Sequence, residues 1–142
     1  MSFDALGELN WLAVIVGAVI YFALGALWYA PPFLGRQWQR SIGWDPQATP
    51  PEMKATTYLV PFLAYLVMAT AIGLLAAATG TDELVEGIVL GVVTGVGLNL
   101  MHTLVDATFD PGKPEPWTWF GINGSYHTLG LIIVSIIVAV WR

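Results

Sequence analysis

Four long apolar stretches dominate this sequence and restrict it to a small set of folds. Each is long enough to cross the roughly 30 Å hydrocarbon core of a bilayer, which takes about 20 helical residues. None shows the period-2 alternation of a membrane strand, and four stretches are too few for a closed barrel. We therefore predict an all-α integral membrane four-helix bundle in a single domain, residues 1–142, with spans at about 10–33, 56–78, 84–105 and 117–141.

The composition agrees with a membrane location and excludes several functions. Hydrophobic residues make up 56% of the chain and charged residues 11%, against roughly 45–50% and about 25% in soluble domains. The net charge is −5, with five Lys and Arg in total, so no nucleic-acid partner is expected, because a phosphate-binding surface needs clustered basic residues. The chain has no cysteine, which excludes disulfides and thiolate metal sites. Asp4 and Glu8 precede the first apolar run without a basic residue, unlike a signal peptide, so we expect that run to remain as a span.

Turn and capping residues mark the ends of the predicted helices. The segment Thr49-Pro50-Pro51-Glu52 is typical of a capping box with proline at the first helical position, which would start the second helix before the bilayer. Pro61 should kink this helix. Gly80 is typical of a helix stop and Thr81 of the next N-cap. This short connection predicts that the second and third helices are antiparallel neighbours.

Basic and aromatic residues predict the orientation. Arg36, Arg40 and Lys54 fall between the first two spans, and Lys113 falls between the last two. The positive-inside rule then places both longer loops in the cytoplasm and both termini outside. No Trp falls in mid-span, as expected for interface anchors. The predicted anchors are Trp11 and Trp141 on the outer side and Trp28, Trp38, Trp44, Trp117 and Trp119 on the inner side.

The loop after the first span contains an amphipathic pattern. Leu34, Trp38 and Ile42 recur every four residues, with Gln and Arg residues between them. We predict a short interfacial amphipathic helix at about 34–43, which would anchor the loop to the membrane surface.

One face of the third apolar stretch combines glycine with polar residues. At 100° per residue this face is about 120° wide, and it holds Gly87, Gly91, Gly95, Asn99, His102 and Asp106. The glycine series is a doubled G-x-x-x-G pattern, which lets another helix approach closely. We therefore predict a helix-packing ridge followed by a polar patch.

The fourth apolar stretch has a matching face. Asn123, His127 and Gly130 lie within about 60° of one another, and we predict Gly130 as a further packing residue. Antiparallel pairing with the third stretch would place Asn99 level with His127 and His102 level with Asn123. The predicted polar intramembrane cluster is therefore Asn99, His102, Asp106, Asn123 and His127.

Three interpretations of this cluster stay open. Intramembrane His and Asn side chains commonly bond one another across a helix pair, which stabilises each pair by under ~1 kcal/mol on average. Ionisable groups in a span are also candidates for a pathway of protons, ions or small polar solutes. Two His and one Asp could hold a divalent metal ion or haem, but His102 and His127 differ by nearly a turn in depth. We expect no cofactor, and the sequence does not decide whether a metal ion binds.

Several short motifs spread over all four spans recur in a known family. Near the start stand Asn10-Trp11, Gly25-x-x-Trp28-Tyr29-x-Pro31 and Gly35-x-x-Trp38, and later come "TFDPGKP" and "INGSYHTLGLIIVSIIVAVW". In these motifs the chain resembles the small bacterial membrane proteins grouped as domain of unknown function 1761. The resemblance implies the fold and a multi-pass location in the bacterial cytoplasmic (inner) membrane, and it implies no substrate.

Two functional classes follow from the sequence. The first is a small channel or permease for ions or small polar solutes, expected to be homo-oligomeric because four short helices enclose little room for an aqueous path. The second is a non-catalytic scaffold or accessory subunit that packs its glycine face against partner membrane helices. We expect no enzyme, because the chain has no nucleophile elbow, phosphate loop or paired-carboxylate motif.

Overall fold

The computed structural model describes residues 3–48 and 52–141, and this part of the chain contains helices and turns but no strand. The predicted all-α membrane-type four-helix bundle is confirmed, since four helices are long and apolar enough to cross a membrane. These are α1 (Trp11–Trp28), α3 (Ala55–Thr79), α6 (Pro116–Val140) and a third span that is divided into α4 (Leu84–Val92), the π-helix η3 (Val93–Leu100) and α5 (Met101–Phe109). The shorter elements are the 3₁₀ helix η1 (Phe3–Gly7), the turn η2 (Pro31–Gly35) and α2 (Arg36–Ser41).

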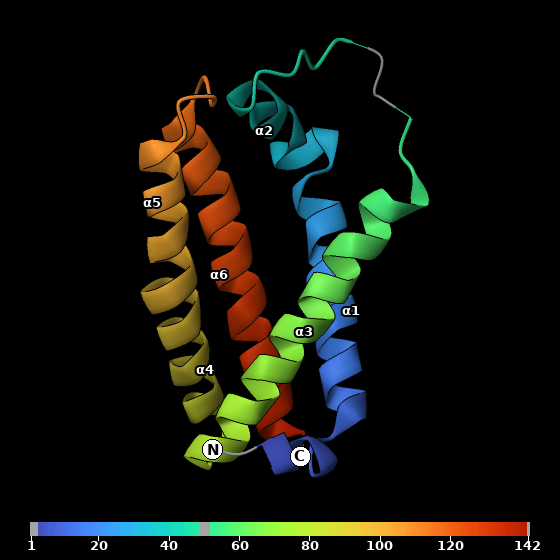
Figure 1. The fold of residues 1–142 in the computed structure, drawn as a ribbon, viewed down its shortest axis with the longest axis vertical. Helices are drawn as coiled ribbons and strands as arrows, with labels where there is room; N and C mark the ends of the chain where they lie inside the picture. The colour runs from blue at the N-terminus through green and yellow to red at the C-terminus, as the bar shows by residue number, and fades with distance from the viewer. Residues whose placement is uncertain (1–2, 49–51, 142) are drawn as a thin grey trace.

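The last helix, α6, lies at the centre of the bundle. Figure 1 shows α1 and α3 on one side of α6 and the third span on the other. Both termini lie at one end of the bundle, and α2 lies at the opposite end. The buried core is formed between α1, α3 and α6 by Val14, Ala18, Tyr21, Ala69, Ile72, Ala76, Tyr126, Leu131, Val134 and Val138.

Asn10 joins the first span to the last. Its side-chain oxygen accepts hydrogen bonds from the N–H groups of Leu12 and Ala13, at 3.1 and 3.2 Å, and so caps α1. Its side-chain nitrogen donates to the carbonyl of Trp141 at 3.0 Å. The two helix ends are therefore held together at the end of the bundle that carries both termini.

The second span begins later than its sequence suggests. α3 starts at Ala55 after an extended Lys54, and residues 52–54 are not helical. The predicted capping box therefore does not start this helix, and its residues 49–51 lie outside the described part of the chain. Pro61 lies inside α3, and Gly80 ends the helix with a left-handed φ of 70°. The next helix has Glu83 rather than Thr81 at its N-cap.

The prediction that the second and third helices are antiparallel neighbours is wrong in one respect, because the two helices do not pack along their length. α3 packs on α1 and α6, whereas α4 packs on α6. Figure 1 shows α3 crossing the bundle diagonally and meeting α4 only near the connecting turn. A short turn fixes the distance between two helix ends but not the direction of their axes, and the glycine ridge of the third span packs against α6.

Candidate functional site

The glycine ridge of the third span packs tightly against α6. A Cβ atom at Gly91 would lie 2.5 Å from the Cα of Ile132, and one at Gly95 would lie 3.1 Å from the carbonyl oxygen of Thr128. Gly87 is similarly enclosed, with its Cβ position 3.0 Å from the Cα of Ile136. The separation at Gly91 leaves no room for a side chain, and a Cβ atom at Gly87 or Gly95 would require the neighbouring backbone of α6 to shift. The ridge therefore serves packing within the chain.

Gly130 packs on the opposite side of α6, against α1. The ring of Tyr21 lies directly over Gly130, where a Cβ atom would overlap the ring. In the reverse direction, the ring of Tyr126 lies over Gly25, with its hydroxyl 2.7 Å from the Cβ position. The same hydroxyl donates to the carbonyl of Tyr21 at 3.0 Å. Each helix thus offers a glycine that accommodates a tyrosine of the other.

This tyrosine packing determines the surroundings of His127 and Asn123. The hydroxyl of Tyr21 lies 2.7 Å from Nδ1 of His127. The hydroxyl of Tyr29 donates to Oδ1 of Asn123 at 2.8 Å. Asn123 also donates through its side-chain nitrogen to the carbonyl of Trp119 at 3.0 Å. Both predicted polar residues of α6 are therefore bonded by tyrosines of α1 and its C-cap, and Asn123 also by α6 itself, and not by the third span.

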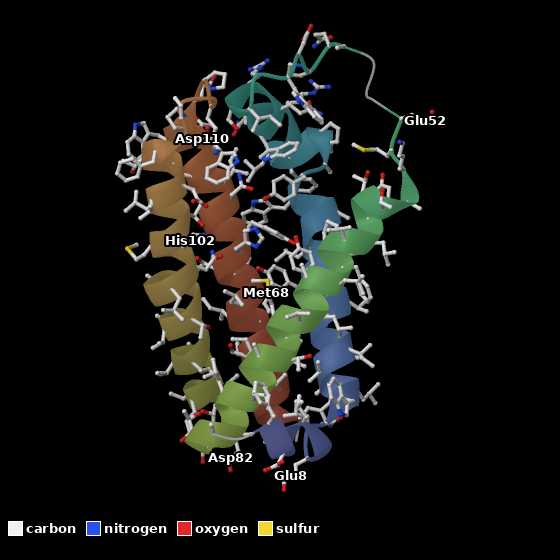
Figure 2. All side chains as sticks on the ribbon, in the orientation of Figure 1. Glu8, Glu52, Met68, Asp82, His102 and Asp110 are labelled. Carbon is white, nitrogen blue, oxygen red and sulfur yellow. The ribbon has the colours of Figure 1, made fainter. Side chains whose placement is uncertain are left out.

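His102 and Asp106 lie apart from this network. Figure 2 shows His102 on α5, which packs on α6 alone among the long helices. The His102 side chain is 76% exposed and that of Asp106 is 48% exposed, and His102 Nε2 lies 3.7 Å from Asp106 Oδ2. These two residues form a pair on the outer face of the third span. The predicted pairing of His102 with Asn123 does not occur.

Asn99 lies between the two groups. It is half-buried, and within the described part of the chain its buried side-chain nitrogen has no hydrogen-bond partner. Its backbone carbonyl accepts from the hydroxyl of Thr103 at 2.8 Å. The predicted pairing of Asn99 with His127 is therefore absent as well.

The π-helix η3 explains why the predicted face is divided. A π-helical turn takes more residues than an α-helical turn, so the residues after it are rotated relative to a regular helix. The buried positions after Gly95 are accordingly Thr103 and Ala107, each one residue later than His102 and Asp106. The prediction assumed a regular α-helix throughout the third span. Because η3 departs from that geometry, His102 and Asp106 do not lie on the same face as the glycines.

The tyrosines at the centre of the bundle were not predicted from the sequence. The rings of Tyr21 and Tyr65 are stacked with centroids 4.3 Å apart, and the rings of Tyr126 and His127 are 4.6 Å apart. Tyr21 and Tyr126 are fully buried. Their position in mid-span, away from the ends where membrane aromatics gather, was the available signal.

The predicted anchor tryptophans lie at or near the ends of the bundle's elements. Trp11 and Trp28 are the first and last residues of α1, and Trp141 follows α6. Trp28 also donates to the carbonyl of Ile122 at 3.2 Å, so it contributes to the α1–α6 contact. The more exposed members of the set are Trp11, Trp44, Trp117 and Trp141, and the half-buried members are Trp28, Trp38 and Trp119.

Metal ligands do not gather in residues 3–48 or 52–141. This part of the chain has no group of three or more His, Asp or Glu side chains that could hold a metal ion. His102 and His127 belong to different faces and do not form a common ligand set.

Comparison with known proteins gives one family. The family described as "Protein of unknown function (DUF1761)" matches residues 12–139. No curated protein and no solved structure matches the chain.

Proposed function

This chain belongs to the DUF1761 family, whose description names no activity, and from that premise we propose a function on the chain's own geometry. In this proposal the protein is a small homo-oligomeric channel or permease. Ions or small polar solutes pass along the exposed face of the third span, the face that carries His102 and Asp106. The structure itself has four helices that are long and apolar enough to span a membrane, and the proposal adds an activity to that finding.

The exposed pair of His102 and Asp106 carries this proposal. Both residues lie in the third span at Leu84–Phe109; the His102 side chain is largely exposed and that of Asp106 is about half exposed. An ionisable side chain facing hydrocarbon costs about 2.5–3.5 kcal/mol at the centre of a span and less near its ends. Asp106 lies about 4.5 Å from the end of the span and His102 about 10 Å from it, at 1.5 Å per residue. Polar groups therefore lead from the membrane surface into the span.

One copy of the chain offers little support for a route through its interior. The polar residues between α1 and α6 are closed into pairs, Tyr21 with His127 and Tyr29 with Asn123. The rings of Tyr21 and Tyr29 both pack against the ring of Tyr126, with centroid distances of 5.4 and 5.2 Å. A polar path is therefore better formed between copies than within one.

A two-fold axis normal to the membrane would suit the outer pair. It would bring His102 of two copies to the same depth and both Asp106 residues about one turn nearer the surface. The remainder of the contact would be apolar and would include Leu98 and Val105, which are 65% and 53% exposed. Such a contact would cover the pair from lipid.

Cysteine cross-linking tests this arrangement in a chain that has no native cysteine. Leu98→Cys and Val105→Cys, on the same outer face as His102, should each form a disulfide dimer in membranes under mild oxidation. Thr103→Cys is the matched control, because Thr103 faces α6 and is 6% exposed. A monomer in every variant would contradict the oligomer and with it the pathway.

Transport itself is tested in proteoliposomes. Wild type should pass protons or potassium ions. The double variant His102→Leu with Asp106→Leu should remain folded, and its flux should be at least about tenfold lower than that of wild type. Met101→Leu, an exposed neighbour of similar size, should keep it. Equal flux in the double variant and wild type would contradict a role for this pair.

The accessory-subunit proposal rests on a second observation. The third span packs on α6 and presents a continuous valine-rich outer surface that includes Val85, Val89, Val92, Val93 and Val96. A foreign membrane helix could occupy this surface in place of a second copy. Absence of both the cross-linked dimer and the flux, in any lipid mixture, would favour this accessory role.

A further inference from the structure

A cavity lies between α1, α3 and α6 at the end of the bundle that carries the termini. Its volume is about 200 Å³, enough for about seven water molecules at roughly 30 Å³ each. Small side chains on α1 and α3 create the space, including Ala13, Ala76 and Ala77. Leu9 partly covers the cavity, and its methyl groups lie 3.4 and 3.5 Å from the position of a Cβ atom at Gly73.

The polar side of this cavity favours a positive charge. Glu8 lies on its wall, and the Glu8 carboxylate forms no ion pair with another described residue. α3 and α6 both end at this cavity, and a helix C-terminus carries partial negative charge. The opposing positive end of α1 is capped by Asn10. Among the residues that the structure describes, the electrostatic balance at the cavity is therefore negative.

The described residues around the cavity carry an excess of the same sign. In the described part of the chain, the charged residues at this end of the bundle are Asp4, Glu8, Asp82, Glu83 and Glu86. Figure 2 shows Glu8 and Asp82 at this end. An excess of one sign raises the local concentration of counter-ions. Trp141 also lines the cavity, and an indole ring is the preferred aromatic partner of an organic cation.

We propose that this cavity binds a small organic ammonium ion, with its short alkyl groups against the alanine walls and its charge beside Glu8. An apolar body with one positive charge matches a cavity that is part apolar and part acidic. The site lies within one copy, on the other side of α6 from His102 and Asp106, so the proposal does not rest on the proposed pathway.

Calorimetric titration of the purified full-length protein in detergent tests the proposal, with the choline ion as the probe. Choline should bind, and its uncharged carbon isostere 3,3-dimethylbutan-1-ol should bind at least about tenfold more weakly. Potassium chloride at matched ionic strength should give no comparable heat. Absence of choline binding, or equal binding of the isostere, would overturn the proposal.

Two variants locate the binding site. Glu8→Gln removes the charge and keeps the shape, and it should weaken choline binding at least about fivefold. Gly73→Ala should also weaken it severalfold, because the added methyl group makes ordinary contacts with Leu9 and Val14 and takes up space in the cavity. Alanine is also the better helix former, so this variant should melt no lower than wild type.

Asp82→Asn is the matched control. It removes one negative charge from the same end of the bundle but does not line the cavity, so it should leave choline binding within about twofold. A loss as large as that of Glu8→Gln would show a general surface effect and overturn the assignment to the cavity. Unchanged binding in Gly73→Ala would do the same.

Discussion

The two sides of α6 use glycine in different ways. Toward the third span, α6 meets a ridge of glycines whose backbone lies against its own backbone. Toward α1, Gly130 and Gly25 instead make room for tyrosine rings, and the hydroxyl groups of those rings bond across the helix pair. The first contact is close and contains few polar groups, whereas the second is wider and contains most of the polar groups in the bundle.

This difference shows what a polar residue in a membrane helix needs. His127 and Asn123 face tyrosine hydroxyls that can reach them. The glycine ridge brings α6 too close for such side chains, and His102 and Asp106 are exposed and bond to neither α1 nor α6 in the described part of the chain. Close packing by small residues and polar pairing are alternative solutions for a helix contact in lipid, and α6 uses one on each side.

The largest effect is expected on the ridge side. Gly91→Leu should prevent native packing of the third span, because the new side chain would overlap the backbone of Ile132, at a cost of about 3 kcal/mol or more. Gly97→Leu in the same helix is the control, since nothing lies within 4 Å of its Cβ position. Thermal unfolding in detergent measures both. Equal melting temperatures for the two variants would contradict the packed ridge.

The tyrosine side should be weakened by the loss of one hydroxyl. Tyr21→Phe keeps the ring over Gly130 but leaves Nδ1 of His127 without its partner, at a cost of about 0.6–1.7 kcal/mol. A double-mutant cycle with His127→Leu isolates the hydrogen bond. If the stability change of the double variant equals the sum of the changes in the two single variants, the 2.7 Å contact contributes nothing.

How far the sequence predicts this molecule depends on the scale considered. Apolar length and composition predict four membrane helices because bilayer thickness allows few alternatives. The spacing of Gly87, Gly91 and Gly95 identifies a face that meets another helix, since no Cβ blocks the approach. At this level the physical constraint acts on a whole segment, so an error of one residue in its bounds does not change the predicted element.

The direction of individual side chains was harder to predict. A regular 100° step places His102 and Asp106 on the glycine face, but the π-helix at Val93–Leu100 changes the phase before they are reached. Nothing in the apolar pattern marks that change. The tyrosine centre was missed because Tyr21 and Tyr126 belong to different spans, and their reciprocal fit with glycine appears only when the two helices are paired.

The effect of this phase change on stability can be measured directly. His102→Leu should change the free energy of unfolding of a single copy by less than about 0.5 kcal/mol, because His102 is exposed. Thr103→Leu should cost about 1–3 kcal/mol, because Thr103 is buried against α6. Denaturant titration of the monomer in detergent distinguishes them. A larger loss of stability in His102→Leu than in Thr103→Leu would contradict the phase change and would indicate that His102 faces α6.

The smallest effect concerns the turn that joins α5 to α6 and closes the ridge side. The ion pair with Lys113 and the N–H of Gly112 hold the pKa of the Asp110 carboxyl below its ordinary value, which is about 4. Lys113 also lies 4.2 Å above the ring of Trp119 on α6. A depressed carboxyl pKa stabilises the folded state above the unfolded pKa, and this contribution is lost as the pH falls through the folded pKa. Asp110→Asn should therefore lower the melting temperature at pH 7 by about 1 °C, with no difference from wild type once the pH is below both values. Because Asp110 is exposed, 1 M salt should also remove most of the difference. A difference that persists at low pH would mean that Asp110 acts through the shape of the turn and not through its charge.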